Sequence, residues 1–152
     1  MTAVVTRVSS ASVDIGSERV AQMGKGLLIL LGVEKGDTKK EAEYLAGKCA
    51  GLRIFEDPDG KLNLDIRDIG GEILLISQFT LYGDARKGRR PGFIKAARPE
   101  KAIPMYEEAI RRLSETLHVE TGEFGADMKV SLVNDGPVTI IMDTDQMMKK
   151  GV

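Results

Sequence analysis

The sequence predicts an α+β fold in which mostly antiparallel or mixed β-sheets form a barrel-like core with two main helices. Segments with the two-residue repeat or the continuous apolar character of strands outnumber segments with helical periodicity, and two helices are inserted among them. The chain has 152 residues, which is the size of one compact domain. Because neither an internal repeat nor a linker divides it, we expect residues 1–152 to form a single domain.

Composition restricts the class of protein. Hydrophobic residues make up 42% and charged residues 30% of the chain, which is typical of a soluble globular protein. The longest apolar run, Leu27–Leu31, falls far short of the ~20 residues that span a bilayer, and the first residues do not have the pattern of a signal peptide. The net charge of −1 means that any basic surface must be local.

Few residues are available for metal or nucleophilic chemistry. With one cysteine, Cys49, and one histidine, His118, the chain can build neither an internal disulfide nor a Cys₄ or multi-histidine metal site. We therefore expect no metal, no cofactor and a reducing, cytoplasmic environment. His118 follows a predicted helix, where dipole and solvent account for a histidine, so we do not expect it to act as a general base. An enzyme of this composition would use hydroxyls, carboxylates, backbone amides or groups of its substrate.

The first part of the chain predicts three strands. Residues 11–15 alternate between apolar and polar side chains, as in a strand with one wet face. Gly16-Ser17 suits a type II′ hairpin turn into a second strand over 18–23. After a glycine-rich break, the continuously apolar segment 27–33 predicts a strand that is buried on both faces.

A helix follows these strands. Thr38 and Glu41 have the spacing of a capping box, with Asp37 as a competing cap. Apolar residues then repeat at helical spacing at positions Ala42, Leu45, Ala46 and Cys49. Since Cys49 lies on this apolar face, we interpret it as a small buried hydrophobe rather than a nucleophile.

The middle of the chain predicts two strands and a long loop. A short strand over 53–55 precedes a turn at Asp57–Gly60, which lacks the ligand pattern of a calcium loop. A buried strand over 72–76 runs into Ser77–Leu81. Residues 82–98 form a loop that is long for a compact domain, and such loops often carry function.

The last part predicts a second helix and two strands. The helix covers roughly residues 100–117 with Pro104 in its first turn. Its apolar face consists of Tyr106, Ala109, Leu113 and Leu117. A turn at Asn134–Pro137 separates strands over 128–133 and 138–142. The polar tail from about Asp145 is expected to fray.

Two short motifs could carry chemistry. Ser77-Gln78-Phe79-Thr80 stands at the end of a buried strand and offers two hydroxyls, an amide and free backbone N–H groups, which are the parts of an oxyanion site. The alternative is that these hydroxyls only satisfy the backbone at a turn. The segment Asn134–Thr139 has the composition of a plain hairpin turn, although the Gly136-Pro137 bond is of the kind that can be cis.

A run of cations falls in the long loop with no acidic residue between its members. It consists of Arg86, Lys87, Arg89, Arg90, Lys95 and Arg98. Contact with phosphates is one interpretation. The other is a solvated loop that forms ion pairs with acids of the second helix, such as Glu107 and Glu108.

Taken together, these motifs resemble the D-aminoacyl-tRNA deacylase (D-tyrosyl-tRNA deacylase) family. The segments that carry the resemblance are Arg7-Val8 with Ala11–Val13, Ser77–Leu81, Lys87–Phe93, Thr121–Met128 and Asn134–Thr139. Each is short, but they occur in order over residues 1 to about 143. We therefore expect the single domain to be of the D-aminoacyl-tRNA deacylase type.

The resemblance implies a cytoplasmic homodimer that acts on tRNA, with no membrane or DNA partner. The reaction would be hydrolysis of the ester between a D-amino acid and the 3′-terminal adenosine, with glycine on mischarged tRNA also removed. Ser77–Leu81 of one subunit and Gly136-Pro137 of the other would line each active site. The Gly136-Pro137 bond would be cis and, with Val138 and Thr139, would form the filter that rejects L-aminoacyl esters.

An aminoacyl ester is already reactive, so a site without a histidine base can hydrolyse it by orienting water and stabilising the oxyanion. We expect the Phe79 N–H to be the main oxyanion donor, with Gln78 supporting it and the 2′-hydroxyl of the terminal ribose assisting. Thr80 is either a nucleophile or a positioning hydroxyl, and the lack of a visible base favours positioning. The cations Arg86, Lys87, Arg89, Arg90 and Lys95 are the expected tRNA contacts. A non-catalytic tRNA-binding module and a structural interaction protein remain the alternatives.

Overall fold

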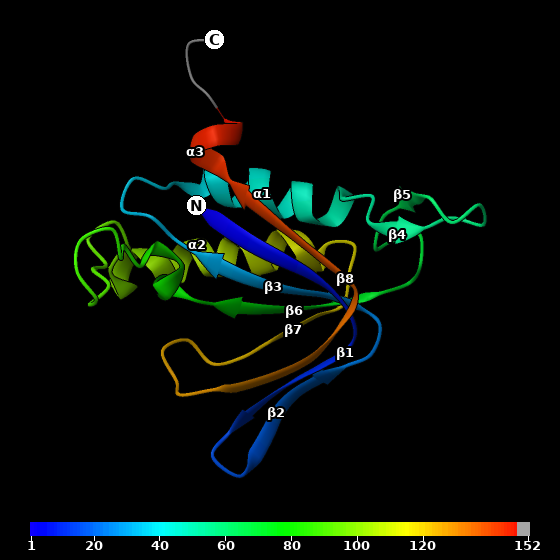
Figure 1. Cartoon of the computed structure of the whole chain (residues 1–152), viewed down its shortest axis with the longest axis horizontal. Helices are drawn as coiled ribbons and strands as arrows, with labels where there is room; N and C mark the ends of the chain where they lie inside the picture. The colour runs from blue at the N-terminus through cyan, green and yellow to red at the C-terminus, as the bar shows by residue number, and fades with distance from the viewer. Residues whose placement is uncertain (149–152) are drawn as a thin grey trace.

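The computed structural model describes residues 1–148 and confirms the expected α+β fold (Figure 1). One mixed sheet has the strand order β2-β1-β3-β6-β7, and β8 pairs with the other edge of β1. The strands of this sheet are β1 (Thr2–Ile15), β2 (Glu18–Met23), β3 (Gly26–Gly32), β6 (Glu72–Ser77), β7 (Val119–Thr121) and β8 (Lys129–Asp143).

The long strand β1 makes the sheet curl into a nearly closed, barrel-like shape. Its first half pairs with β3 and its second half with β2, while β8 follows it along both halves. Strands β3, β6 and β7 run parallel to one another. The hairpin between β1 and β2 is confirmed, and a positive φ occurs at Gly16 but not at Ser17, as a type II′ turn requires.

Strand β3 is buried on both faces, as expected. Leu27, Ile29 and Leu31 face a core that the helices cover, whereas Leu28 faces the inside of the curled sheet. The helices α1 (Lys39–Gly51) and α2 (Pro99–Ser114) lie on the same face of the sheet (Figure 1). The Tyr106 hydroxyl on α2 donates to the Leu75 carbonyl at 2.8 Å, which ties this helix to β6.

Helix α1 forms as the sequence predicts. Thr38 caps it, and Glu41 completes the capping box. The expected apolar stripe faces the core, and burial raises the pKa of the Cys49 thiol to about 12. Cys49 is therefore a buried hydrophobe and not a reactive thiol.

Helix α2 begins at Pro99, within one residue of the expected start, but the predicted place of Pro104 in its first turn is wrong. Pro99 takes the first helical position, where a missing N–H costs nothing, and Pro104 lies inside the helix. The carbonyl that has no N–H partner as a result belongs to Glu100 in the exposed first turn, so water can solvate it. The helix also ends at Ser114, and Leu117 packs on the core from beyond it.

The short strands differ from the sequence-based prediction. The strand expected over 53–55 is instead β4 (Phe55–Glu56), which pairs with β5 (Leu62–Leu64) across the expected turn at Asp57–Gly60. Strands β5 and β7 were not predicted. Both are only three residues long and too short to show periodicity.

The predicted turn at Asn134–Pro137 is also wrong. Strand β8 is continuous, and both of its halves pair with β1 in the same antiparallel direction. Thr6 faces Thr139 and Val8 faces Asn134, so the extra residues between them bulge out of the ladder. The turn-forming sequence therefore makes a bulge within one strand and not a hairpin between two.

The first residues of the segment expected to fray form a short helix, α3 (Thr144–Met147), whose start is bonded to the first residue of the chain. The remainder of that expectation concerns residues 149–152, which lie outside the described part of the chain. None of the helices in residues 1–148 is long and apolar enough to cross a membrane.

Candidate active site

The turn Ser77–Thr80 lies at the carboxyl end of β6, in the middle of the parallel part of the sheet. Ser77 pairs with Leu31 of β3, and the next N–H, that of Gln78, donates to the Leu31 carbonyl at 2.8 Å. The chain then makes a 3₁₀ turn, η1 (Phe79–Tyr82). A buried ladder therefore fixes the position at which this turn begins.

Gly32 allows the 3₁₀ turn to lie directly against the end of β3. A Cβ at Gly32 would lie 3.0 Å from the Tyr82 ring and 3.3 Å from the Gln78 carbonyl oxygen. The Tyr82 hydroxyl donates to the Gly32 carbonyl at 3.4 Å and accepts from the Thr2 hydroxyl at 3.2 Å. Burial is the main cause of the raised pKa of Tyr82, so this phenol stays protonated and holds η1 in place.

The turn offers donors rather than a base. The Gln78 side-chain amide donates to the Thr80 hydroxyl at 2.9 Å. Among the hydrogen bonds of residues 1–148, none uses the backbone N–H of Phe79 or Thr80, and none joins the Thr80 hydroxyl to a carboxylate. His118 precedes β7 near the start of β6, where its ring contacts Glu120 at 2.7 Å and is 60% exposed. It lies at the opposite end of β6 from Thr80, which agrees with its exclusion as the base.

A cleft of about 680 Å³ opens over this turn. Its polar side chains are those of Ser77, Gln78, Thr80 and Asp127, and most of its remaining wall is apolar. Phe79 and Phe93 meet at the mouth in an edge-to-face contact with ring centroids 5.2 Å apart. Besides the four predicted residues, the lining includes Val33, Ile76, Phe93, Ala96, Ala97, Pro99, Ala102, Phe124, Gly125, Ala126, Asp127, Met128 and Val130.

The segment Phe124–Val130 of this lining was not assigned a site role from the sequence. Asp127 is the one carboxylate among the residues that line the cleft. A role for this segment in the site could have been inferred only from the family resemblance, since Thr121–Met128 is one of the segments that carry it. Neither its spacing nor its residue types indicate chemistry on their own.

The second predicted motif lies elsewhere on the same chain. None of Gly136, Pro137, Val138 and Thr139 lines the cleft, and the Gly136-Pro137 bond is cis. Asn134 holds the bulge from inside, since its side chain accepts from the Val138 N–H at 3.0 Å and donates to the Thr139 hydroxyl at 3.3 Å. The structure of one chain therefore brings Ser77–Thr80 together but does not bring Gly136–Thr139 to them.

Arg7 holds the bulge from the sheet side. Its guanidinium is buried and donates to the Asp135 carbonyl at 2.9 Å and to the Ile54 carbonyl at 2.8 Å. Glu56 and the Asp135 carboxylate lie at 3.8 Å and 4.0 Å from it. Because a buried guanidinium needs these partners, the backbone at Asp135 is fixed next to Gly136.

The cations of the long loop differ in their partners. Arg86 forms a two-point ion pair with Asp84, with contacts of 2.9 Å and 2.8 Å that hold the pKa of Asp84 at about 2. Lys95 lies 3.9 Å from Glu34, and Arg98 lies 3.7 Å from Glu100. Within residues 1–148, Lys87, Arg89 and Arg90 form no ion pair.

The alternative interpretation, ion pairs between this loop and acids of the second helix, holds for Arg98 with Glu100 but not for Glu107 or Glu108 within the described residues. Arg111, three residues along the same helix, lies 2.6 Å from the Glu108 carboxylate and lowers its pKa to about 2. Glu108 is therefore already neutralised within α2. This leaves three loop cations of the described chain free to bind an external anion.

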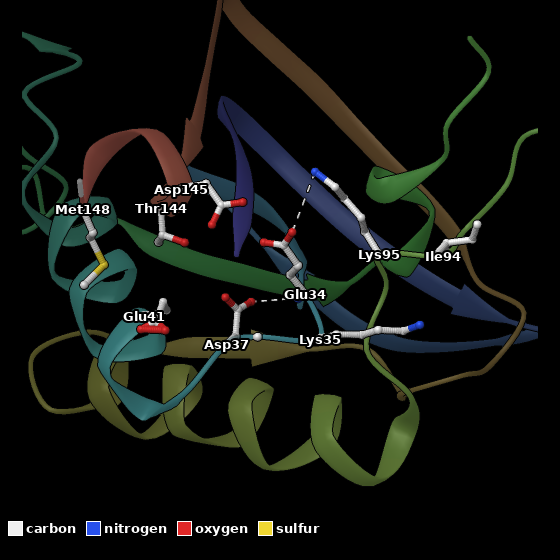
Figure 2. A pocket seen from close by; sticks show the side chains of 10 residues that line it. Glu34, Lys35, Asp37, Glu41, Ile94, Lys95, Thr144, Asp145 and Met148 are labelled. Carbon is white, nitrogen blue, oxygen red and sulfur yellow. Dashed lines mark hydrogen bonds and ion pairs between the residues drawn. The ribbon is translucent and has the colours of Figure 1, made fainter. Parts of the chain in front are cut away.

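A separate hollow of about 620 Å³ lies between α1, α3 and the loop (Figure 2). Its carboxylates have structural partners: Asp37 accepts from the Met1 amine at 2.9 Å and from the Glu34 N–H at 2.7 Å, and Glu41 closes the capping box. Burial and the nearby Asp145 raise the pKa of Glu34, toward which Lys95 extends in Figure 2. No metal-ligand cluster is present among the residues that the structure describes.

The chain is similar to known proteins over most of its length. The family model described as D-Tyr-tRNA(Tyr) deacylase matches residues 4–143. A D-aminoacyl-tRNA deacylase from Symbiobacterium thermophilum is 57% identical over 145 residues, which cover 95% of this chain and 96% of the relative.

Two solved structures share the fold. The "c-Myc DNA Unwinding Element Binding Protein" has a TM-score of 0.89 at 41% identity, covering 94% of this chain and 98% of that one. A structure described as "a probable eukaryotic D-amino acid tRNA deacylase" has a TM-score of 0.80 at 15% identity, covering 93% and 99%. The second likeness concerns the fold alone.

Proposed function

This chain belongs to the D-Tyr-tRNA(Tyr) deacylase family and is an enzyme of the D-aminoacyl-tRNA deacylase class, and we propose that its reaction takes place in the cleft at the end of β6. The observation that carries this proposal is the turn Ser77–Thr80 beside a cleft of about 680 Å³, since the N–H groups of Phe79 and Thr80 have no protein acceptor in residues 1–148. The substrate is the ester of a D-amino acid with the terminal adenosine of tRNA, and the products are the free amino acid and tRNA.

The chemistry follows from the groups at the turn. Water adds to the ester carbonyl carbon, and the negative charge that develops on the carbonyl oxygen is stabilised by the Phe79 N–H, with the Gln78 amide nearby. The carbon–oxygen bond to the 3′-oxygen then breaks, and the proton from water ends on that oxygen. The neighbouring 2′-hydroxyl of the ribose assists this transfer, since no base of the described chain contacts Thr80.

Thr80 positions the substrate rather than attacking it. Its hydroxyl accepts a hydrogen bond from the Gln78 amide, which is a donor and cannot remove a proton. A hydroxyl nucleophile needs an adjacent base to become reactive. The contact therefore favours the positioning role over a covalent acyl-threonine.

Selectivity requires a second copy of the chain. The bulge Gly136–Thr139 is exposed and does not line its own cleft, and the same strand exposes apolar side chains at Leu132, Val133 and Ile141. In a homodimer, the bulge of one subunit would face the cleft of the other. Backbone fixed by Arg7 and Asn134 would then clash with an L side chain, while a D side chain and glycine would be accepted.

The cations of the long loop bind phosphates of the tRNA outside its aminoacylated terminal adenosine. Lys87, Arg89 and Arg90 have no acidic partner within residues 1–148, and Arg86 and Lys95 flank them. Such groups bind phosphates irrespective of base sequence. A tRNA substrate and a buried, unreactive thiol also fit the cytoplasmic setting that the sequence predicts.

The experiment that tests this function follows ester loss from D-tyrosyl-tRNA, L-tyrosyl-tRNA and glycyl-tRNA. We expect loss of the D-tyrosyl and glycyl esters and persistence of the L-tyrosyl ester. Equal loss of both tyrosyl esters would refute the proposed filter. Retention of tRNA in a gel without cleavage of any ester would instead favour a non-catalytic binding module.

A further inference from the structure

Another hollow, of about 980 Å³, lies beside the catalytic turn and outside the cleft. Residues 84–92 of the loop close on themselves, since the Asp84 N–H donates to the Gly92 carbonyl at 2.7 Å and the Gly92 N–H donates to the Asp84 carbonyl at 2.9 Å. The hollow lies against this closed loop. The residues that line it include Tyr82, Asp84, Arg86, Lys87, Arg90 and Lys95.

The hollow is strongly basic. Four of its lining residues are cations and one, Asp84, is an acid. Arg86 satisfies Asp84 with two contacts, so this pair adds no net charge. Lys87 and Arg90 have no acidic partner in the described part of the chain, and Lys95 is 71% exposed with Glu34 at 3.9 Å. An anion with several oxygens satisfies such an arrangement.

The hollow adjoins the active-site cleft along one strip of chain. Phe79 and Tyr82 belong to the same 3₁₀ turn, and the former lines the cleft while the latter lines the hollow. Likewise, of the consecutive residues Phe93 and Ile94, Phe93 lines the cleft and Ile94 lines the hollow. A nucleotide chain that leaves the cleft across the Phe79–Phe93 pair therefore reaches the hollow directly.

We infer that this hollow binds the phosphodiester groups that directly precede the terminal adenosine, in the unpaired 3′ end of the tRNA. This inference rests on the proposed function, which places the terminal adenosine in the cleft. Lys87 and Arg90 bind the phosphates, and Lys95 adds to the positive field. Arg86 has a different role, because its ion pair with Asp84 maintains the shape of the loop.

Arg89 provides a matched control. It lies between two of the cations, is exposed and has no ion pair within residues 1–148, but it does not line the hollow. Its side chain can contact a more distant part of the tRNA, but it does not reach the phosphates next to the terminal adenosine in the proposed arrangement. Removing it should therefore leave the binding of a short 3′-end oligonucleotide unchanged.

The test compares Lys87→Ala/Arg90→Ala with Arg89→Ala on three D-tyrosyl esters: of adenosine, of the trinucleotide cytidyl-cytidyl-adenosine, and of whole tRNA. For the double variant we expect KM to rise about tenfold with the trinucleotide and with tRNA, kcat to stay within about twofold, and the adenosine ester to be unaffected. The slope of log affinity against log salt for the trinucleotide should fall by about 0.7 for each phosphate that is no longer neutralised. For Arg89→Ala, we expect no change with the trinucleotide.

Binding of fluorescein-labelled, uncharged trinucleotide is measured alongside by fluorescence anisotropy, so that the result does not depend on turnover. The inference is overturned if the double variant binds this probe as tightly as the wild type, if Arg89→Ala weakens it equally, or if the adenosine ester is affected to the same degree. If no ester is hydrolysed by the wild type while the probe still binds through Lys87 and Arg90, the proposed function fails and the phosphate site stands.

Discussion

Replacing Gly32 by alanine tests whether the close approach of β3 to the catalytic turn matters for the reaction. An ordinary contact to a Cβ begins at 3.4 Å, so the new methyl would displace the Tyr82 ring by about 0.4 Å (3.4 − 3.0) and the Gln78 carbonyl by about 0.1 Å (3.4 − 3.3). Gly32 does not have a positive φ, so alanine can adopt its backbone conformation and the effect is one of space alone.

We expect Gly32→Ala to lower stability by about 1–3 kcal/mol, the usual cost of overpacking. Turnover should fall by about tenfold, because a shift of 1 Å at a reacting group can cost about a hundredfold and the displacement here is a fraction of that. The effect should appear in kcat for D-tyrosyl-tRNA under single-turnover conditions, with thermal unfolding recorded in parallel.

Gly36→Ala is the matched control, since a Cβ at Gly36 meets nothing within 4 Å and this residue also lies in the segment that follows β3. It should leave kcat unchanged. Wild-type turnover in Gly32→Ala, or an equal fall in turnover in both variants, would show that the contact between Gly32 and η1 does not position the reacting groups.

Four further outcomes are expected for other parts of the molecule. Thr80→Ala should retain substantial turnover, whereas a substrate with a 2′-deoxy terminal ribose should lose most of it; a trapped acyl-Thr80 intermediate would contradict this. Cys49, with its pKa raised to about 12 by burial, should resist a thiol reagent at pH 8 in the native protein and react on unfolding. Asp84→Asn should release Arg86, so that trypsin cleaves the native loop at residues 86–89 faster than in the wild type; equal rates would mean that the ion pair does not hold the loop. Because burial raises the pKa of Glu34 in the folded protein, its ionisation opposes folding as the pH rises through and above the ordinary range of a glutamate. Glu34→Gln should therefore flatten the fall in unfolding temperature over that range, and an unchanged pH profile would exclude this role.

Local patterns determined the elements whose signal is complete within a few residues. The capping box at Thr38 and the apolar stripe that ends at Cys49 specify α1, and the continuous apolar run at 27–33 specifies a strand that needs cover on both faces. The turn Ser77–Thr80 was also identified correctly as the end of a buried strand. In α1 the cap and the side-chain period are themselves the physical cause of the element, and in β3 the cause is the continuous apolar run.

Tertiary structure decided the features that depend on a distant partner. Asn134–Pro137 has the residues of a turn, but both flanking segments pair with β1 in the same direction, so this segment forms a bulge within one strand. Arg7, near the other end of the chain, binds the backbone of the bulge. Strand β7 exists because β6 offers it a parallel edge, and its own three residues carry no period. Pro104 is tolerated within α2 because the carbonyl that it leaves without an N–H partner belongs to Glu100, an exposed residue in the first turn.

The sequence also does not show which of the loop cations are paired within the protein. In the sequence, Arg86, Lys87, Arg89 and Arg90 are equivalent members of one basic run. In the folded chain, Arg86 pairs with Asp84, whereas Lys87 and Arg90 line the basic hollow. Arg89 lies outside this hollow. Residue type determines that a side chain can bind phosphate, but which cations are neutralised within the protein and which stay free is set by the path of the backbone around them.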